Sequence, residues 1–310
     1  MGPRPCGGGA LECAALDTTA VDWLLNAKGC SGTRWAVLTT INGPTPAVQQ
    51  LAEADGWCIA VISDLKGPAR YDLPRASSHG LFFLNASLQK KLAADSTFVS
   101  SIPWNHFGRK NLGYLVAIAR GAQVIWDFDD DNLVTAGDFP DFPRGLDSGI
   151  LQVLWTPGPG AHLGSGGVLN IYSALGCPVW PCWPRGFPLS LARSRAPNRS
   201  EWLQSSELSK PSKRVAVLQS LADKDPDVDA IFRLTSPSAT EIYFQPPGKE
   251  VLALPAFTFC PANAQAALHR RDAFWGLLLP MTVSGRVSDI WRSYLMQRLL
   301  WDVGLLRMQR

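Results

Sequence analysis

Short apolar runs alternate with helix-like segments over the first 130 residues of the chain, and this alternation restricts the fold more than any other feature. Continuous apolar runs that are too short for helices and are bounded by turn residues predict buried strands. Such runs occupy 34–40, 57–62, 81–84 and 123–126. Helical segments are predicted between them, at 47–54, 87–93 and 108–120. This order predicts an α/β domain with a central, mainly parallel mixed sheet flanked by helices.

The second half of the chain is less regular. Residues 137–212 are rich in Gly, Pro and Arg and have weak periodicity, which predicts long irregular connections. Strands are predicted at 214–219 and near 242–244. The segment 288–303 places large side chains at a spacing of three to four residues and is predicted to be a helix.

The composition excludes several classes of protein. Of the 310 residues, 46% are apolar and 18% are charged, as in a folded globular protein rather than a disordered one. The net charge of +3 is small and dispersed, which argues against a nucleic-acid partner. No apolar run approaches the roughly eighteen residues that a membrane helix needs, so we expect no membrane span in this chain.

The seven cysteines have irregular spacing. Cys177 and Cys182 form a close pair, but no second pair lies at the spacing of zinc ligands. Cys58 lies inside an apolar run and is interpreted as a core residue. Disulfides among the others would fit a secretory compartment, although the spacing selects no partners.

Four aspartates lie within five positions directly after the apolar run at 123–126: Asp127, Asp129, Asp130 and Asp131. Their carboxylates repel one another, and exposed side chains here gain nothing from packing. A divalent cation resolves the repulsion, because carboxylate oxygens are the ligands that Mg²⁺ and Mn²⁺ prefer. A solvated acidic turn or a calcium loop is the alternative, although the Gly and the late Glu of an EF-hand loop are missing.

Alternate residues of an extended segment point the same way, so we predict that Asp129 and Asp131 bind one ion, Mn²⁺ or Mg²⁺. Asp130 then points elsewhere, toward a ribose hydroxyl or the backbone, and Asp127 supports the metal ligands. Such a metal neutralises the diphosphate of a nucleotide donor and stabilises it as a leaving group. The cluster therefore predicts a nucleotide-diphosphate site.

Two other predicted strands also end in polar residues. Thr39, Thr40 and Asn42 follow the first strand, and Asp64 and Lys66 follow the second. The carboxyl ends of parallel strands meet at one edge of a sheet, which is where ligands bind in open α/β sheets. We therefore expect these residues to converge with the acidic cluster.

Seven blocks of sequence resemble the STELLO family. They are Trp35–Asn42 with Pro44–Pro46, Gly56–Trp57, Asp64–Pro68, Ile102–Tyr114, Asp127–Asn132, Leu218–Thr235 and Ala273–Arg292. The blocks occur in the same order and extend over nearly the whole chain. More distantly, Gly285–Trp291 is similar to the reversibly glycosylated polypeptides, which are UDP-arabinopyranose mutases.

The STELLO family consists of proposed plant Golgi glycosyltransferases of the GT-A fold that are implicated in the assembly of cellulose synthase complexes in cell-wall synthesis. The resemblance implies a GT-A-like, Rossmann-like domain that moves a sugar from a UDP-sugar donor to an acceptor. It also implies a Golgi-lumen location, with the membrane anchor of the plant members absent from this chain. We expect a poorly structured lead-in over 1–32 and one domain over 33–310, with a nucleotide-binding half at 33–135 and an acceptor-side half at 136–310.

The resemblance also suggests which residues bind the donor. Thr39, Thr40, Asn42, Asp64, Lys66 and Asp130 would form the base and ribose pocket, with ordinary strand-end turns as the alternative for any one of them. Arg109 and Lys110 follow Gly108 at a helix start, where charge and free helix amides would bind the diphosphate. A solvated basic pair is the alternative for these two residues.

A transferase also needs a base for the acceptor or a group that stabilises the leaving group. Asp289 is the first candidate, although an aspartate at a helix start is also good capping chemistry. Asp272, and Asp227 or Asp229, are second choices, and Asp229 could instead pair with Arg233 one helical turn later.

Two other functions fit the same residues. A protein with a retained nucleotide-sugar site could act as a non-catalytic assembly factor for polysaccharide synthase complexes. A nucleotide-sugar mutase is ranked last, because the arginine used by the mutases has no assigned counterpart in this chain.

Overall fold

A computed structural model of the chain describes residues 30, 32–73, 80–134, 139–142, 152–153, 167–179, 181–192, 206–207, 214–236, 241–244, 252–254 and 257–309. The lead-in expected over 1–32 therefore lies outside the described residues except at 30 and 32, as does much of the irregular stretch at 137–212.

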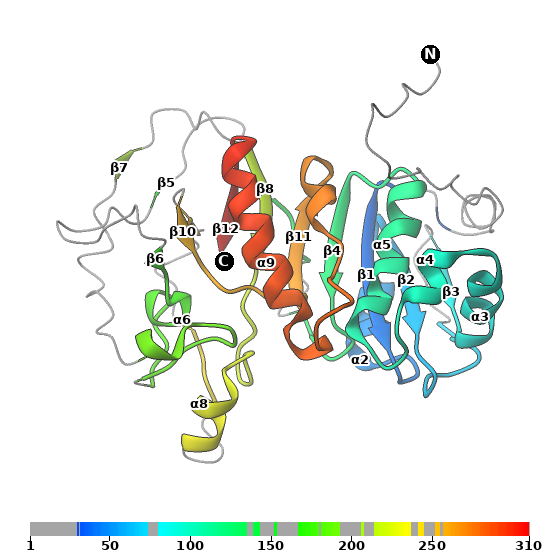
Figure 1. Ribbon diagram of the computed structural model, residues 1–310, viewed down its shortest axis with the longest axis horizontal. Helices are drawn as coiled ribbons and strands as arrows, with labels where there is room; N and C mark the ends of the chain where they lie inside the picture. Colours follow the sequence, from blue (N-terminus) through cyan, green and yellow to red (C-terminus); the bar gives the residue numbers. More distant parts are fainter. Residues whose placement is uncertain are drawn as a thin grey trace.

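An eight-stranded sheet runs through the molecule (Figure 1). In spatial order its strands are β3 Leu81–Leu84, β2 Trp57–Ser63, β1 Arg34–Thr40, β4 Val124–Phe128, β11 Ala266–Arg270, β8 Arg214–Gln219, β12 Leu305–Gln309 and β9 Leu252–Ala253. The first four strands are mutually parallel, and β11 pairs antiparallel with both β4 and β8. Two small sheets pair β10 Thr258–Phe259 with β6 Gly167–Val168, and β5 Gln152–Val153 with β7 Ser206–Glu207. The predicted α/β class and the mainly parallel mixed sheet are confirmed.

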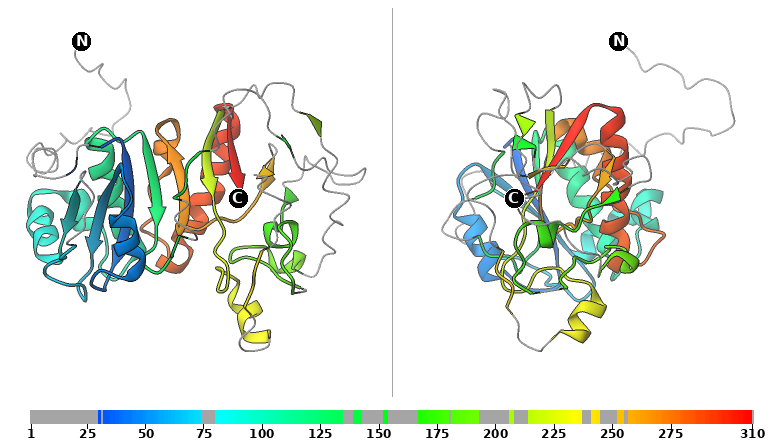
Figure 2. Two further views of the ribbon diagram at one scale, coloured as in Figure 1. Left: turned by 180° about the vertical axis from the view of Figure 1, so that it is seen from behind. Right: turned by 90° about the vertical axis from the view of Figure 1, so that its left-hand side faces the viewer.

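Helices cover both faces of the sheet (Figures 1 and 2). They are α2 Pro46–Ala52, α3 Ala86–Asp95, α4 Thr97–Ser101, α5 Lys110–Ala119, α6 Ile171–Ala174, α8 Ala230–Thr235 and α9 Gly285–Asp302, with the 3₁₀ turns η1 Phe107–Arg109, η4 Leu189–Leu191 and η5 Arg271–Gly276. One apolar cluster joins α3, α4, α5 and η5 to the sheet, and another joins α2 to the opposite face. The two faces are therefore both buried near β1 and β2.

The strand pattern follows from this two-sided burial. All seven residues of β2 are buried, which explains its unbroken apolar sequence. In β4, by contrast, the strand continues two residues beyond the predicted end and includes Asp127, which is fully buried. The acidic cluster is thus divided, with one aspartate in the core and the others in the following turn.

A second unit lies at the β12 side of the sheet, where α6 and α8 sit together (Figure 1). Its separate apolar cluster includes Tyr172, Trp183 and Phe232. The short strand expected near 242–244 is only an isolated bridge between Ile242 and Lys224. A bridge forms there because Lys224 and Ile242 exchange backbone hydrogen bonds without continuing into a ladder.

Two disulfides are present among the described residues. Cys58 is fully buried, as predicted, and is joined to Cys30, while Cys177 is joined to Cys182. Cys260 is a buried free thiol. None of the described helices combines the length and apolar character that crossing a membrane requires.

Candidate functional site

The carboxyl ends of the parallel strands β1, β2 and β4 lie at the same edge of the sheet. Thr40 of β1 lies opposite Ser63 of β2 in the register, and β4 runs parallel to β1 on its other side. Asp64 and the acidic turn after β4 therefore emerge at the same edge. Strand β11 begins at this edge too, since Ala266 pairs with Phe128 in the antiparallel register.

Asp130 ties the acidic turn to the loop after β1. Its carboxylate accepts hydrogen bonds from the Thr40 hydroxyl and, at 3.2 Å, from the Asn42 amide. Its backbone carbonyl accepts from the hydroxyl of Thr45, which also caps the N-terminus of α2. Residues 129–132 form a turn rather than an extended segment, since the Asn132 N–H donates to the Asp129 carbonyl at 3.3 Å. The contacts of Asp130 fix this turn from one side.

Lys110 fixes the turn from the other side. Its ammonium group lies 2.6 Å from an Asp127 oxygen and 3.2 Å from an Asp129 oxygen, and it donates 2.8 Å hydrogen bonds to the carbonyls of Phe128 and Ala264. Asp127 also pairs with Arg292 of α9 at 2.8 Å. Burial opposes ionisation of Asp127, but the two cations outweigh it and lower the pKa of this carboxyl below its ordinary value.

Asp129 and Asp131 remain as the open carboxylates of the turn. Burial raises the pKa of Asp129 to about 6; Lys110 opposes this shift, and the neighbouring Asp127 and Asp131 add to it. The Asp129 side chain keeps 31% of its surface exposed. Asp131 is exposed, and among the described residues it accepts a hydrogen bond from the Asn132 amide at 3.2 Å.

This arrangement fits a divalent cation. Burial and the neighbouring carboxylates raise the pKa of Asp129, and a hard cation bound beside it would relieve this crowding of negative charge. Within the described part of the chain, no cluster of three His, Cys, Asp or Glu side chains forms a complete metal cage. A metal on Asp129 and Asp131 would thus take its other ligands from water and a diphosphate, as Mg²⁺ commonly does.

Arg109 is buried and is not open to a ligand at this edge. Its guanidinium group is almost fully buried, stacks 3.6 Å from the Trp104 ring and donates to Gln89 and to the carbonyl of Ile102. Burial lowers the pKa of Arg109 to about 10, with a smaller opposing effect of Asp64. The expected contact of Arg109 with a diphosphate is not supported by this placement, because the side chain is used to close the core around α3 and α4.

Lys110 needs a similar correction. It lies at the site but has no exposed surface, and its ammonium group is occupied by two carboxylates and two carbonyls. Its geometry suits positioning of the Asp127–Asp129 segment rather than direct contact with a donor.

The other donor-side candidates are spread along the same edge. Asn42 and Lys66 are exposed, whereas Asp64 is buried and accepts from the backbone N–H groups of Leu65 and Asn105. Thr39 points to the sheet face opposite that of Thr40 and is partly buried. Asn42 and Lys66 are therefore the polar groups of this set that are open to a ligand.

Arg185 forms a clamp that sequence reasoning missed. Its guanidinium group donates to both oxygens of Asp227 at 2.7–3.0 Å and to both oxygens of Asp289 at 2.7 and 2.9 Å. These ion pairs raise the pKa of Arg185 further above its ordinary value, although burial opposes them. Two carboxylates that share one guanidinium group leave this side of the site locally negative.

Asp289 lies in the fifth position of α9, whose cap is Ser284, so the capping alternative is wrong. The residue is 3% exposed, and its oxygens also accept from the backbone N–H groups of Ala264 and Ile290. Asp272 is exposed in η5, next to the residue that pairs with Gln123 before β4, and so lies at the opposite edge of the sheet. The structure does not bring Asp272 to the site, because β11 carries the chain away from it.

A chain of side-chain hydrogen bonds connects the acidic turn to this clamp. Asn132 accepts from Gln265 at 2.8 Å, Gln265 accepts from Asn263 at 2.9 Å, and Asn263 donates to Asp227 at 2.9 Å. The acidic turn and the Arg185 clamp are thus connected by a continuous row of hydrogen-bonded polar side chains. A small cavity of about 20 Å³ opens beside it and is lined by residues that include Tyr172, Arg185, Gln219, Leu221, Asp227 and Asn263.

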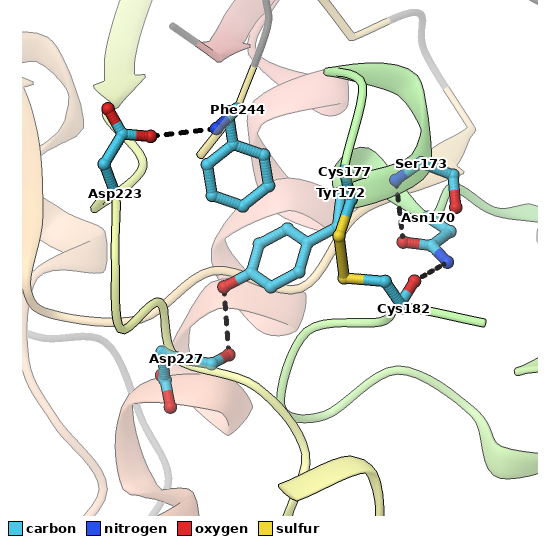
Figure 3. Close-up of a disulfide and its surroundings, with 8 residues drawn as sticks. All are labelled: Asn170, Tyr172, Ser173, Cys177, Cys182, Asp223, Asp227 and Phe244. Carbon is cyan, nitrogen blue, oxygen red and sulfur yellow. Dashed lines mark hydrogen bonds between the residues drawn. A yellow bond between two sulfur atoms is a disulfide. The ribbon is translucent and has the colours of Figure 1, made fainter. Parts of the chain in front are cut away.

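The Cys177–Cys182 disulfide lies beside Tyr172 and near Asp227, one partner of Arg185 (Figure 3). It closes the loop between α6 and the segment that leads to Arg185. Tyr172 lies beside it and donates from its hydroxyl to the carbonyl of Asp227 at 3.0 Å, as the close-up shows. The disulfide-closed loop thereby holds the backbone on both sides of the Arg185–Asp227 pair.

No protein-family model matches the chain. The chain is similar to "Probable glycosyltransferase STELLO1" of Arabidopsis thaliana, with 32% identity over 278 residues, 87% of this chain and 34% of that protein. "Probable glycosyltransferase STELLO2" of the same plant is 31% identical over the same length and shares. The chain spans about a third of the length of these curated relatives.

Proposed function

Because the chain belongs to the STELLO family and spans about a third of the length of STELLO1 and STELLO2, we propose that it is the donor-binding domain of a metal-dependent glycosyltransferase. The donor is a UDP-sugar, and its sugar is transferred to an acceptor. The family resemblance is also the ground for proposing a Golgi-lumen location and a role near cellulose synthase complexes.

The observation that carries this proposal is the fixed acidic turn at the carboxyl end of β4. Asp130 and Lys110 anchor the turn on its two sides, and Asp129 and Asp131 are left open between these anchors. These two carboxylates would hold Mn²⁺ or Mg²⁺. A metal at this position supplies Lewis-acid stabilisation of a departing diphosphate.

The exposed polar groups beside the turn complete the donor side. Asn42 is exposed next to Asp130 and has an amide that can reach a ribose hydroxyl. Lys66 is an exposed cation on the turn after β2, at the same edge. We assign to Lys66 the contact with the diphosphate for which Arg109 and Lys110 are too deeply buried.

The acceptor side is built around the Arg185 clamp. Asp289 is almost enclosed, with a side chain that is 4% exposed, whereas the side chain of Asp227 is 24% exposed and lines the small cavity. A general base must reach the proton that it removes. Asp227 is therefore the better placed of the two to contact an acceptor hydroxyl, with Arg185 and Asn263 orienting its carboxylate.

The enclosure of Asp289 also favours a second candidate function. If neither carboxylate can be freed from Arg185, the domain would bind a nucleotide-sugar without efficient transfer and act as an assembly factor.

Donor turnover in the absence of an acceptor separates these two functions. We expect the purified protein to release UDP slowly from one member of a UDP-sugar panel in the presence of Mn²⁺. Asp227→Asn should reduce the rate of this release by at least roughly 100-fold, the lower limit of the usual contribution of a proton-transfer group. Binding of a UDP-sugar with no release, in wild type and variant alike, would favour the assembly factor.

The metal affinity should depend on pH through Asp129. Because burial raises the pKa of Asp129 to about 6, a proton competes with the metal below that pH and not above it. We expect the Mn²⁺ affinity to be constant above about pH 7 and to fall by up to about tenfold for each unit below about pH 6. Electron paramagnetic resonance of free Mn²⁺ measures this, and the same affinity at about pH 5 and about pH 8 would contradict it.

A further inference from the structure

The layer between α9 and the sheet is polar where a hydrophobic core is expected. Two rows of paired residues cross the sheet on this face: Ile125, His269, Val217 and Arg307 in one, and Asp127, Ala267, Gln219 and Gln309 in the other. All the polar members of both rows are buried. The apolar cluster at this place is small, consisting of Ala216, Val217, Ala273, Met296 and Leu300. Figure 1 shows α9 lying against the part of the sheet formed by β8, β11 and β12.

Arg307 brings a charge into this layer. It is 5% exposed and donates to the carbonyl of Cys260 at 2.6 Å and to the side-chain oxygen of Gln309 at 2.9 Å. The ion pairs formed by the described residues do not include Arg307. Both of its polar partners are neutral, so its positive charge is not compensated by any described side chain.

The groups around Arg307 respond to this charge. Burial lowers the pKa of Arg307 and raises that of the Cys260 thiol beside it, so the thiol stays protonated. Burial, with repulsion from Arg292 and Arg307, lowers the pKa of His269 to about 3, although Asp127 acts in the opposite direction. His269 is therefore neutral, and Asp127 is already shared by Lys110 and Arg292.

A cavity lies between these groups. Its volume is about 20 Å³, and its lining includes Gln219, His269, Arg292, Gln297 and Arg307. The Nε of Arg307 and both ring nitrogens of His269 are buried and have no hydrogen-bond partner among the described residues. A neutral imidazole has one N–H donor, so the cavity lining offers one charged and one neutral donor, beside the Oε1 of Gln219, a neutral acceptor that also has no partner among the described residues.

We propose that this cavity binds a small monovalent inorganic anion, of the size of chloride, through the Nε–H of Arg307 and a ring N–H of His269. A water molecule would satisfy the donors but would leave a buried cation uncompensated, which is costly in a medium of low dielectric constant. The volume of about 20 Å³ is that of one or two water molecules and is too small for phosphate or sulfate. This proposal does not depend on the proposed transferase activity.

The first test is the thermal stability of the full chain in sodium chloride against sodium gluconate at constant ionic strength. Gluconate is too large to enter the cavity, and the two variants below separate a specific site from the general effects of the two salts. We expect the melting temperature to rise by about 3–6 °C between about 1 mM and about 300 mM chloride, with a similar rise in bromide. Equal melting temperatures in chloride and gluconate would overturn the proposal.

Two variants assign the effect to the cavity. Arg307→Met should remove the dependence on chloride. Arg298→Met should retain it, because Arg298 is exposed on the outer face of α9 and pairs with Asp302. An unchanged chloride dependence in folded Arg307→Met would exclude the site.

Bromide located in crystals of the wild-type protein keeps the proposal testable even if Arg307→Met does not fold. We expect an anomalous peak within hydrogen-bonding distance of the Arg307 Nε. A cavity filled only by water, in crystals grown in bromide, would overturn the proposal.

Discussion

Lys110→Met should lower the free energy of unfolding by roughly 3–5 kcal/mol, the usual cost of removing one partner from a buried ion pair. Lys110 has no exposed surface, and its loss leaves Asp127 with Arg292 as its remaining cation. The carbonyls of Phe128 and Ala264 also lose their donor. Met has a similar length and adds no polar group, so steric effects should be small. Urea denaturation followed by tryptophan fluorescence measures the change.

Lys66→Met is the matched control. Lys66 is exposed at the same edge of the sheet, and the same substitution there should change stability by less than about 0.5 kcal/mol. A loss below about 1 kcal/mol in Lys110→Met would mean that the Asp127–Lys110–Arg292 group does not hold the acidic turn in place.

Asp131→Asn should weaken metal-dependent nucleotide-sugar binding by roughly 100-fold, or about 2.7 kcal/mol, while leaving the fold intact. Asp131 is exposed, and its described contact is with the neighbouring Asn132, so the substitution disturbs no core group. Asparagine keeps the size of the side chain but removes the charge that a divalent cation requires. Isothermal titration calorimetry with a UDP-sugar in the presence of Mn²⁺ measures the change.

Asp55→Asn provides the comparison for this variant. Asp55 is an exposed aspartate before β2, at the opposite edge of the sheet. The Asp55→Asn protein should bind the nucleotide-sugar with the affinity of the wild type. If Asp131→Asn also binds normally, the acidic turn is a solvated surface feature and not the metal site.

The parallel part of the sheet could be predicted because burial on both faces leaves a simple pattern. The predicted strands at 34–40 and 81–84 have the observed bounds, and β2 is longer than predicted by one residue. The predicted end of β4 is two residues early, because an aspartate in the sequence is typical of a turn and not of a buried strand. Asp127 is compatible with a buried strand only through its two cations.

Local spacing could not predict whether the side chains of Arg109 and Lys110 point to a ligand or into the core. Charges at a helix start are compatible with a bound phosphate and with burial alike. Burial of Arg109 depends on Gln89 and Ile102, and that of Lys110 on Ala264, which lies 154 residues later in the chain. These contacts arise from tertiary packing, so no periodicity in the sequence reports them.

Arg185 was missed for a related reason. It lies in a Gly- and Pro-rich stretch with no periodicity, and its partners Asp227 and Asp289 are 42 and 104 residues away. A weak signal was present, since both aspartates are candidates for a catalytic base, and two carboxylates that lie close together favour a shared cation.

The most direct test of the metal-dependent donor site is calorimetry of the wild-type protein with a panel of UDP-sugars, with Mn²⁺ and then with EDTA. Binding through Asp129 and Asp131 predicts a roughly micromolar dissociation constant for at least one donor in Mn²⁺ and no measurable binding in EDTA. Well-folded protein that binds no donor in Mn²⁺, or that binds one equally well in EDTA, would contradict the assignment.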